Sequence, residues 1–189
     1  MGAKFEKGPI PGLVVITPDV YRDGRGWFTE SYHAQRYFEN GIKTVFVQDN
    51  RSFSTKNVLR GLHFQLHRPQ AKLVSVIRGT VWDVAVDIRW GSPTFRQWYG
   101  VELSAENAKQ FYIPAGFAHG FCVLSDEAEF HYKCSEFYDP KDDRGLQWNE
   151  PAIGVEWPVK EPVLSQKDTL RIPFEKLKEE DFPHVNLDL

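Results

Sequence analysis

Hydrophobic and polar residues alternate along short segments that cover most of the chain. Alternation of this kind is typical of half-buried strands, and it predicts strands over residues 13–17, 43–48, 73–78, 80–88, 97–103 and 129–138. Strands are also expected on both sides of a turn at Pro114 and Gly116. The expected helices are short: residues 31–40 with Ser31 as N-cap, a brief turn at 104–108, and residues 174–182. Short strands without a long helix predict an all-β sandwich or barrel.

The candidate chemistry gathers around residues 58–65. Apolar residues there alternate with Arg60 and His63 across Gly61, which indicates a strand that enters a site. In a regular strand Arg60 and His63 point to opposite faces, but a bulge at Gly61 would bring them onto one face. An arginine beside a histidine suits an anionic or polarised ligand next to a proton acceptor.

Polar side chains on two other predicted strands are candidate ligand contacts. Gln48 and Asn50 stand where one strand is expected to end, and their amides suit either a ligand or a plain turn. Asp83 shares one face of strand 80–88 with small apolar residues. If it is buried it needs a hydrogen-bonding or cationic partner, and Lys72 is the nearest candidate in the sequence.

The segment over residues 21–28 combines two glycines and two arginines with flanking aromatic residues. It indicates a hairpin turn, or a phosphate clamp in which Arg25 lies near a ring that stacks on a base. The spacing alone favours neither interpretation. The whole chain is rich in aromatic residues (Trp 6, Tyr 7, Phe 14), which fill β-rich cores and stack on flat ligands.

At 189 residues the chain is expected to form one domain, with a core over about residues 10–170 and a C-terminal extension over 171–189. Residues 139–159 contain three prolines and two tryptophans, and they are expected to form an ordered cover over the sheet. The net charge of −3 favours neither nucleic acid nor a membrane as partner. No stretch reaches the roughly 20 apolar residues of a membrane span.

The cysteines and the N-terminus bear on the expected compartment. Cys122 and Cys134 are the only cysteines and lack CxxC spacing, so two reduced and buried thiols are expected rather than a disulfide. Residues 1–9 have no apolar run and do not resemble a signal peptide. The expected location is the cytoplasm.

Two motifs resemble those of cupins: Gly61-x-His63-x-Gln65 with Lys72, and Pro114-x-Gly116-x-x-His119. The resemblance implies an all-β, cupin-type jelly roll (a double-stranded β-helix) with a few short peripheral helices. Gln65 and Lys72 stand where metal-binding cupins carry a second His and a Glu, and an ammonium group repels a cation. A catalytic metal is therefore not expected.

The residues that remain suggest proton abstraction. A base surrounded by cations suits removal of a proton whose carbanion is stabilised as an enolate, and His63 with Arg60, Lys72 and His119 fits this description. A carboxylate on the far ring nitrogen would orient His63. Asp168 and Asp83 are both candidates for that carboxylate.

A longer set of segments resembles the dTDP-4-dehydrorhamnose 3,5-epimerase family over about residues 10–170. The segments are VQDN (47–50), VLRGLHFQ (58–65), QAKLV (70–74), DVAVD (83–87), IPAGFAHGF (113–121), YKC (132–134), WN (148–149) and LSQKD (164–168). The resemblance implies an isomerase that inverts C3 and C5 of dTDP-4-dehydro-6-deoxy-D-glucose in dTDP-L-rhamnose synthesis, without a cofactor. It also implies a homodimer.

The resemblance assigns roles to individual residues. It implies that His63 is the base, that Asp168 is its paired carboxylate, that Tyr132 is the acid on the opposite face and that Lys72 stabilises the enolate. The implied substrate contacts are Arg60 and His119 at the sugar and diphosphate, Gln48 and Asn50, Arg25 at the diphosphate across a dimer interface, Tyr21 at the thymine, and Glu30, Asp83 and Tyr138. Phe137 stands where many relatives have Tyr, which bears on product stereochemistry.

More than one function is compatible with these motifs. Some members of the family epimerise only C3 or only C5, and the motifs are shared by both kinds. Two further hypotheses are a metal-dependent cupin enzyme and a non-catalytic sugar-binding jelly roll. Without the resemblance, Tyr132 would be a core tyrosine, Lys72 a solvated strand end and Asp168 a loop charge. The remaining histidines are expected to be structural or on the surface: His33, His67, His131 and His184.

Overall fold

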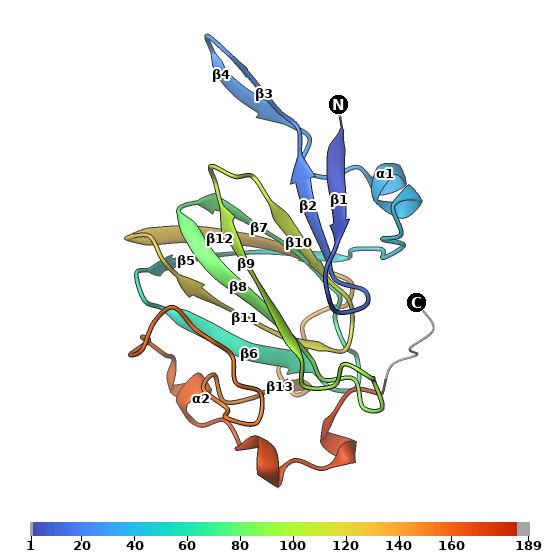
Figure 1. Ribbon diagram of the computed structural model, residues 1–189, viewed down its shortest axis with the longest axis vertical. Helices are drawn as coiled ribbons and strands as arrows, with labels where there is room; N and C mark the ends of the chain where they lie inside the picture. Colours follow the sequence, from blue (N-terminus) through green and yellow to red (C-terminus); the bar gives the residue numbers. More distant parts are fainter. Residues whose placement is uncertain (1, 185–189) are drawn as a thin grey trace.

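Two antiparallel sheets packed face to face make up the body of the chain in the computed structural model, which describes residues 2–184 (Figure 1). The six-stranded sheet has the order β1 (Ala3–Lys7), β2 (Val14–Pro18), β10 (Gln110–Ile113), β7 (Lys72–Arg78), β12 (Glu127–Cys134), β5 (Gln48–Thr55). The five-stranded sheet has the order β13 (Asp143–Gly145), β6 (Leu59–Gln65), β11 (Phe117–Val123), β8 (Thr80–Asp87), β9 (Trp98–Ser104). The predicted all-β jelly roll is confirmed.

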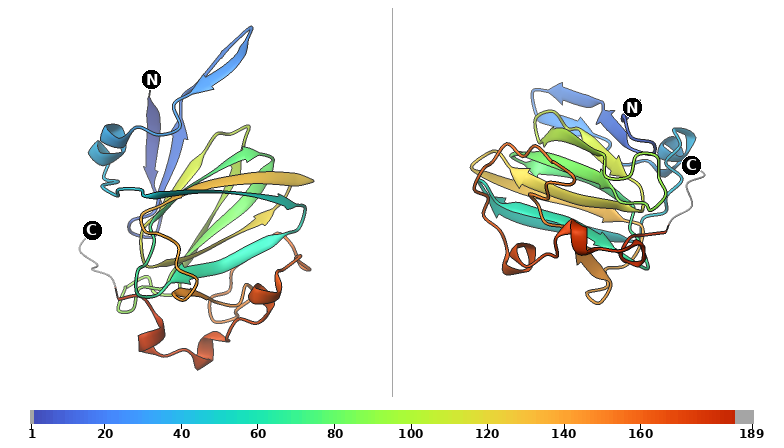
Figure 2. Two further views of the ribbon diagram at one scale, coloured as in Figure 1. Left: turned by 180° about the vertical axis from the view of Figure 1, so that it is seen from behind. Right: turned by 60° about the horizontal axis from the view of Figure 1, so that its bottom comes forward.

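The main hydrophobic core lies between the two sheets, which Figure 2 shows as stacked layers. Phe130 of the six-stranded sheet stacks on Phe121 of the five-stranded sheet with ring centroids 4.1 Å apart. Because β8 is covered on both faces, its alternation sorts residues into two clusters: Val81 and Ala85 join the core between the sheets, whereas Val84 and Val86 face outward. The faces predicted for residues 80–88 are confirmed.

The outer face of the five-stranded sheet is covered by the segment that follows β12. Ile153, Trp157 and Phe182 pack on the outward-facing residues of β6 and β8, and the indole N–H of Trp157 donates a hydrogen bond to the carbonyl of Trp148 at 2.7 Å. The expected cover over the sheet is therefore present. It matters for function because the same segment carries the side chains that close one side of the pocket described below.

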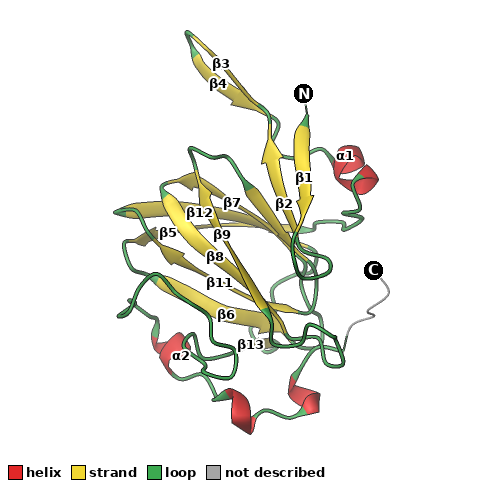
Figure 3. Cartoon of the chain, viewed as in Figure 1, coloured by secondary structure: helices red, strands yellow, loops and turns green. Residues whose placement is uncertain are grey.

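The helices are short and lie at the periphery (Figure 3). Helix α1 (Ala34–Glu39) begins three residues later than predicted, and its N-cap is His33 instead of Ser31, because the His33 ring accepts a hydrogen bond from the Arg36 N–H at 3.3 Å. Helix α2 (Gln166–Thr169) follows an N-cap at Ser165, whose hydroxyl accepts from the Asp168 N–H.

The prediction of a helix over residues 174–182 is wrong. Two separate 3₁₀ turns, η1 (Phe174–Lys176) and η2 (Glu179–Asp181), take its place. The ring centroids of Phe174 and Phe182 lie 5.2 Å apart, whereas eight residues of α-helix rise about 12 Å. Packing both rings into one aromatic cluster with Phe95 requires the chain to fold back between them.

The strand predicted over residues 43–48 is also wrong, because β5 begins at Gln48. The residues before it alternate for another reason: Phe46 packs into the small cluster near α1, and the Thr44 hydroxyl bonds to that of Tyr112 at 2.6 Å. Gln48 and Asn50 therefore lie within a strand and not beyond its end. Likewise, β12 runs over Glu127–Cys134, earlier than the predicted 129–138.

The hairpin predicted over residues 21–28 is confirmed as β3 (Val20–Asp23) and β4 (Gly26–Thr29). It projects away from the sandwich and exposes Tyr21, Trp27 and Phe28 (Figure 1). Both cysteines are free and buried, as predicted. No helix within residues 2–184 is long and apolar enough to cross a membrane.

Candidate active site

A cavity of about 320 Å³ opens between the two sheets and is closed on one side by the α2 segment. It brings together seven of the residues singled out from the sequence. Its lining is Ser52, Arg60, His63, Lys72, His119, Phe121, Phe130, Tyr132, Tyr138, Asp143, Ser165, Lys167 and Asp168. Residues far apart in the chain meet here because some neighbouring strands, such as β6 and β11 or β7 and β12, are distant in the sequence.

A bulge in β6 places Arg60 and His63 on the same cavity wall. His63 pairs with His119 of β11 and Arg60 pairs with Phe121, so three steps along β6 match two steps along β11. Gly61 has a φ of +137°, and a Cβ there would lie 2.5 Å from the Cα of Gly120. Only glycine tolerates such a close approach of two backbones. The bulge predicted from the sequence is confirmed.

His63 is paired with Asp168. Its Nε2 lies 2.5 Å from Asp168 Oδ1, and the Ser165 hydroxyl donates to Oδ2 at 2.8 Å. Burial works to raise the pKa of Asp168, but the His63 hydrogen bond and charge, the Ser165 hydroxyl and the Arg171 guanidinium outweigh it and lower the pKa. With Asp168 ionised, His63 Nε2 carries the proton and Nδ1 is the basic nitrogen. Of the two carboxylates considered from the sequence, the structure pairs Asp168 with His63.

His119 takes the other carboxylate, Asp83. Its Nε2 lies 2.9 Å and 3.1 Å from the two Asp83 oxygens, and both side chains are buried. Asp83 therefore has a different partner from the one expected, because His119 on the neighbouring strand β11 reaches it directly, whereas Lys72 lies on the facing sheet. Burial lowers the pKa of His119 despite Asp83, and Lys72 and His63 lower it further.

Lys72 and Tyr132 line the cavity from the six-stranded sheet. Burial lowers the pKa of Lys72, against the opposing influence of Cys134, Asp143 and Asp83. Burial raises the pKa of Tyr132, with a further increase from Cys134, so its phenol stays protonated at neutral pH and can donate a proton. His63 and Tyr132 thus lie on opposite walls of one cavity.

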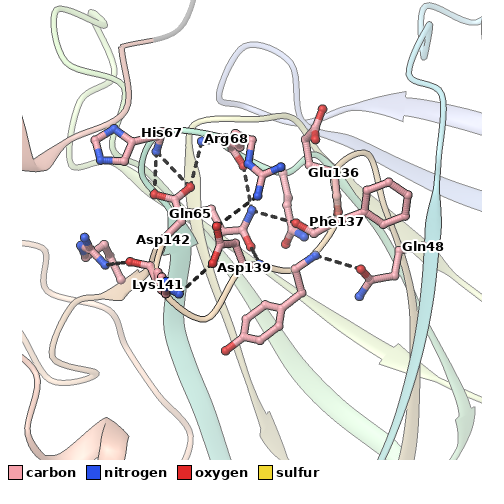
Figure 4. A network of polar contacts seen from close by, with 12 residues as sticks. Gln48, Gln65, His67, Arg68, Glu136, Phe137, Asp139, Lys141 and Asp142 are labelled. Carbon is pink, nitrogen blue, oxygen red and sulfur yellow. Dashed lines mark hydrogen bonds and ion pairs between the residues drawn. The ribbon is translucent and has the colours of Figure 1, made fainter.

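Gln48 and Asn50 do not line the cavity but support the segment that carries Tyr138. The Gln48 side chain donates to Asn50 Oδ1 at 2.9 Å and accepts from the Tyr138 N–H at 2.9 Å. Gln65 holds the same segment: its amide donates to the carbonyls of Arg68 and Phe137 and accepts from the Asp139 N–H (Figure 4). Gln65, which stands where metal-binding cupins carry a second His, thus bonds to backbone groups. No cluster of three potential His, Cys, Asp or Glu metal ligands occurs within residues 2–184.

Three predicted contacts lie away from the cavity of this chain. The Arg25 side chain, at the tip of the hairpin, is 91% exposed and pairs with Asp23. The Tyr21 hydroxyl donates to Asp19, and Glu30 pairs with Arg36. None of the three side chains lines the cavity of its own chain, so their predicted contacts with substrate stay predictions.

Several cavity residues were not singled out from the sequence. Lys167 and Ser165 belong to the LSQKD segment, whose N-cap pattern was the available signal. Asp143 lies in the loop-rich cover and pairs with Lys167. Nothing in its local sequence marks it, since its place depends on the short pairing of β13 with β6.

Comparisons with known proteins show the family to which the chain belongs. The profile of the family described as dTDP-4-dehydrorhamnose 3,5-epimerase matches residues 7–176. The chain belongs to this family. The relative from Shigella flexneri is 56% identical over 86% of this chain and 91% of its own length, and the relative from Methanothermobacter thermautotrophicus is 51% identical over 87% and 91%. Both are named dTDP-4-dehydrorhamnose 3,5-epimerase.

A solved structure supports the same assignment. The dTDP-6-deoxy-D-glucose-3,5-epimerase of Legionella pneumophila, crystallised with dTDP-4-keto-L-rhamnose, matches with a TM-score of 0.94 at 49% identity, over 98% of this chain and 100% of that one. The epimerase family, the isomerase class and the jelly-roll fold predicted from the sequence are confirmed by these matches.

Proposed function

We propose that this epimerase inverts C3 and C5 of dTDP-4-dehydro-6-deoxy-D-glucose, giving dTDP-4-dehydro-L-rhamnose. The observation that carries the proposal is the placement of an imidazole base and a phenol on opposite walls of one cavity. Inversion of a carbon requires that the proton leave from one face and return to the other. A keto sugar bound between the walls presents one face to His63 and the other to Tyr132.

In the proposed reaction, His63 Nδ1 accepts the proton from the carbon next to the C4 ketone. The electron pair of the broken C–H bond moves onto the ketone oxygen to form an enolate, and the Lys72 ammonium stabilises the negative oxygen. Tyr132 then donates its proton to the opposite face of the carbon. The His63 imidazolium releases its proton to solvent and the Tyr132 phenolate takes one up from solvent, so both groups return to their starting states with no net gain or loss of protons. Asp168 stabilises the imidazolium formed in the first step. The same sequence at the second carbon completes the epimerisation.

The substrate class is supported by charge at the cavity and by the relatives. Arg60 lies at the cavity with its guanidinium held by the Ser54 hydroxyl at 3.0 Å and the Phe53 carbonyl at 3.2 Å. A fixed guanidinium is well suited to a phosphate oxygen. The Legionella relative holds a dTDP-linked 4-keto sugar, and we infer the same chemical class of substrate for this chain.

Solvent-exchange NMR tests the function. When dTDP-4-dehydro-6-deoxy-D-glucose is incubated with the enzyme in D₂O, deuterium is expected at both C3 and C5 of an inverted product, because each proton passes through a solvent-exchanging group. Deuterium at one carbon alone would indicate a single-site epimerase. Binding without any deuterium incorporation would contradict the proposal and favour a sugar-binding protein.

We also propose that the chain works as a homodimer in which the projecting hairpin completes the partner's site. The hairpin exposes Tyr21, Trp27 and Phe28, and it carries Arg25 beyond reach of its own cavity. Exposed aromatic residues of this kind mark contact surfaces. Light scattering is expected to give twice the mass of one chain; the mass of a single chain would contradict the proposal. The cytoplasmic location stays a prediction.

A further inference from the structure

Arg171 lies directly behind the His63–Asp168 pair, outside the cavity lining. Its Nη2 is 3.8 Å from Asp168 Oδ1, the same oxygen that binds His63, and 3.5 Å from Asp143 Oδ2. The side chain is only 9% exposed. The guanidinium therefore contacts two carboxylates that border the cavity, and reaches His63 only through Asp168.

The Arg171 guanidinium interacts with its surroundings by charge rather than by hydrogen bonds. Its Nε and Nη2 are buried without a hydrogen-bond partner among the described residues, and a buried charge without hydrogen bonds costs free energy. Space for the guanidinium exists because residue 145 is glycine: a Cβ there would lie 2.6 Å from Arg171 Nε. Only the Arg171 carbonyl is held, by the Gln147 amide at 3.1 Å. Charge, and not hydrogen bonding, is what the guanidinium contributes here.

We propose that Arg171 is a positioning residue that sets the basicity of His63 through Asp168. The inference rests on the proposed role of His63 as the base. A positive charge beside Asp168 partly neutralises that carboxylate, so the carboxylate stabilises the His63 imidazolium less strongly. Arg171 thereby limits how strongly Asp168 holds His63 in its protonated form.

Other charged and titratable groups also face His63 and remain constant in the test. They are Arg60 on its own strand, His119 on β11, Lys72 on β7, Tyr132 on β12, Tyr138 on the segment after β12, Asp143 on β13, and Lys167 and Asp168 on α2. Lys167 pairs with Asp143, so Asp143 keeps one cationic partner when Arg171 is removed. Asp168 keeps only His63 as an ion-pair partner among the described residues. The change is therefore concentrated on Asp168.

The test compares Arg171→Met, Arg171→Gln and Arg171→Lys with wild type. We expect Met and Gln to move the acid limb of the kcat/KM profile to higher pH by about half to one unit, because Asp168 without the Arg171 cation stabilises the imidazolium of the proposed base more strongly. Lys keeps the charge and is expected to stay near wild type. Arg144→Met, which removes an exposed arginine one residue from Asp143, is the matched control and should leave the profile in place.

A ligand-free measurement separates this inference from the proposed function. NMR titration of the His63 ring nitrogens reports its pKa even if the chain does not turn over the proposed substrate. An unmoved His63 titration in the Met and Gln variants, with a uniform loss of rate or of melting temperature, would show a structural role only and overturn the inference. A shift of equal size in Arg171→Lys would also overturn it. If Arg171→Met does not fold, the comparison of Arg171→Gln with Arg171→Lys decides between the positioning role and a structural role.

Discussion

Replacement of His63 with asparagine is expected to reduce kcat about 10³-fold or more. A reduction of this size is typical for the loss of a general acid or base. Asparagine keeps a polar group next to Asp168, but it cannot accept a proton at neutral pH. Because His63 is the base of the first step, exchange of substrate protons with D₂O should fall in parallel with epimerisation. Initial rates by NMR in D₂O measure both quantities.

The matched control is His67→Asn, which changes an exposed histidine four residues away on the same segment. His67 contributes its backbone N–H, and not its ring, to Asp142, so the control should keep wild-type activity. A His63→Asn enzyme that still exchanges protons at the wild-type rate would rule out His63 as the base.

Replacement of Tyr132 with phenylalanine is expected to separate exchange from inversion. The ring keeps its packing against the core residues near Phe130, but the group that donates a proton from the wall opposite His63 is lost. His63 can still remove a proton and return a deuteron to the same face, so exchange with retention should persist. Inversion should fall about 10²-fold or more, measured as the ratio of epimerised to deuterated substrate.

Two other tyrosines test the specificity of this assignment. Tyr99→Phe changes a tyrosine that packs against the core beside Phe111, away from the cavity lining, and should behave as wild type. Tyr138, predicted from the sequence as a substrate contact, lines the same cavity and brings a second phenol to it. If the Tyr132→Phe enzyme inverts the substrate at the wild-type rate and the Tyr138→Phe enzyme does not, then Tyr138 and not Tyr132 is the acid.

Local rules accounted for most of the strands but failed where packing between distant segments decides conformation. Residues 80–88 alternate because both faces of β8 are buried, and the prediction held. Residues 43–46 alternate equally well, yet they belong to no strand, and Phe46 packs into the small cluster near α1. Alternation reports burial of every second side chain and not hydrogen bonding of the backbone.

In the site, too, some residues could be identified from local sequence and others depend on contacts between distant segments. His63 and His119 were found from the sequence because their motifs have a fixed spacing over a few residues, whereas Lys72 and Tyr132 gained their roles from the resemblance to the epimerase family. The pairing of Asp83 with His119 could not be predicted from local sequence, because it depends on the register between β8 and β11. The choice of Asp168 for His63 likewise depends on how α2 folds over β6, 105 residues along the chain.

The sequence by itself determined the all-β class, the segments that supply the chemistry and the family, because strand alternation and motif spacing are written over a few neighbouring residues. The family resemblance implied the pairing of His63 with Asp168 and the place of Tyr132 opposite the base, but only the tertiary structure decided that Asp83 meets His119 and that Arg171 lies behind Asp168. Charges interact over a few ångströms in space whatever their separation in the chain, and those distances arise only when the two sheets and their cover have packed together.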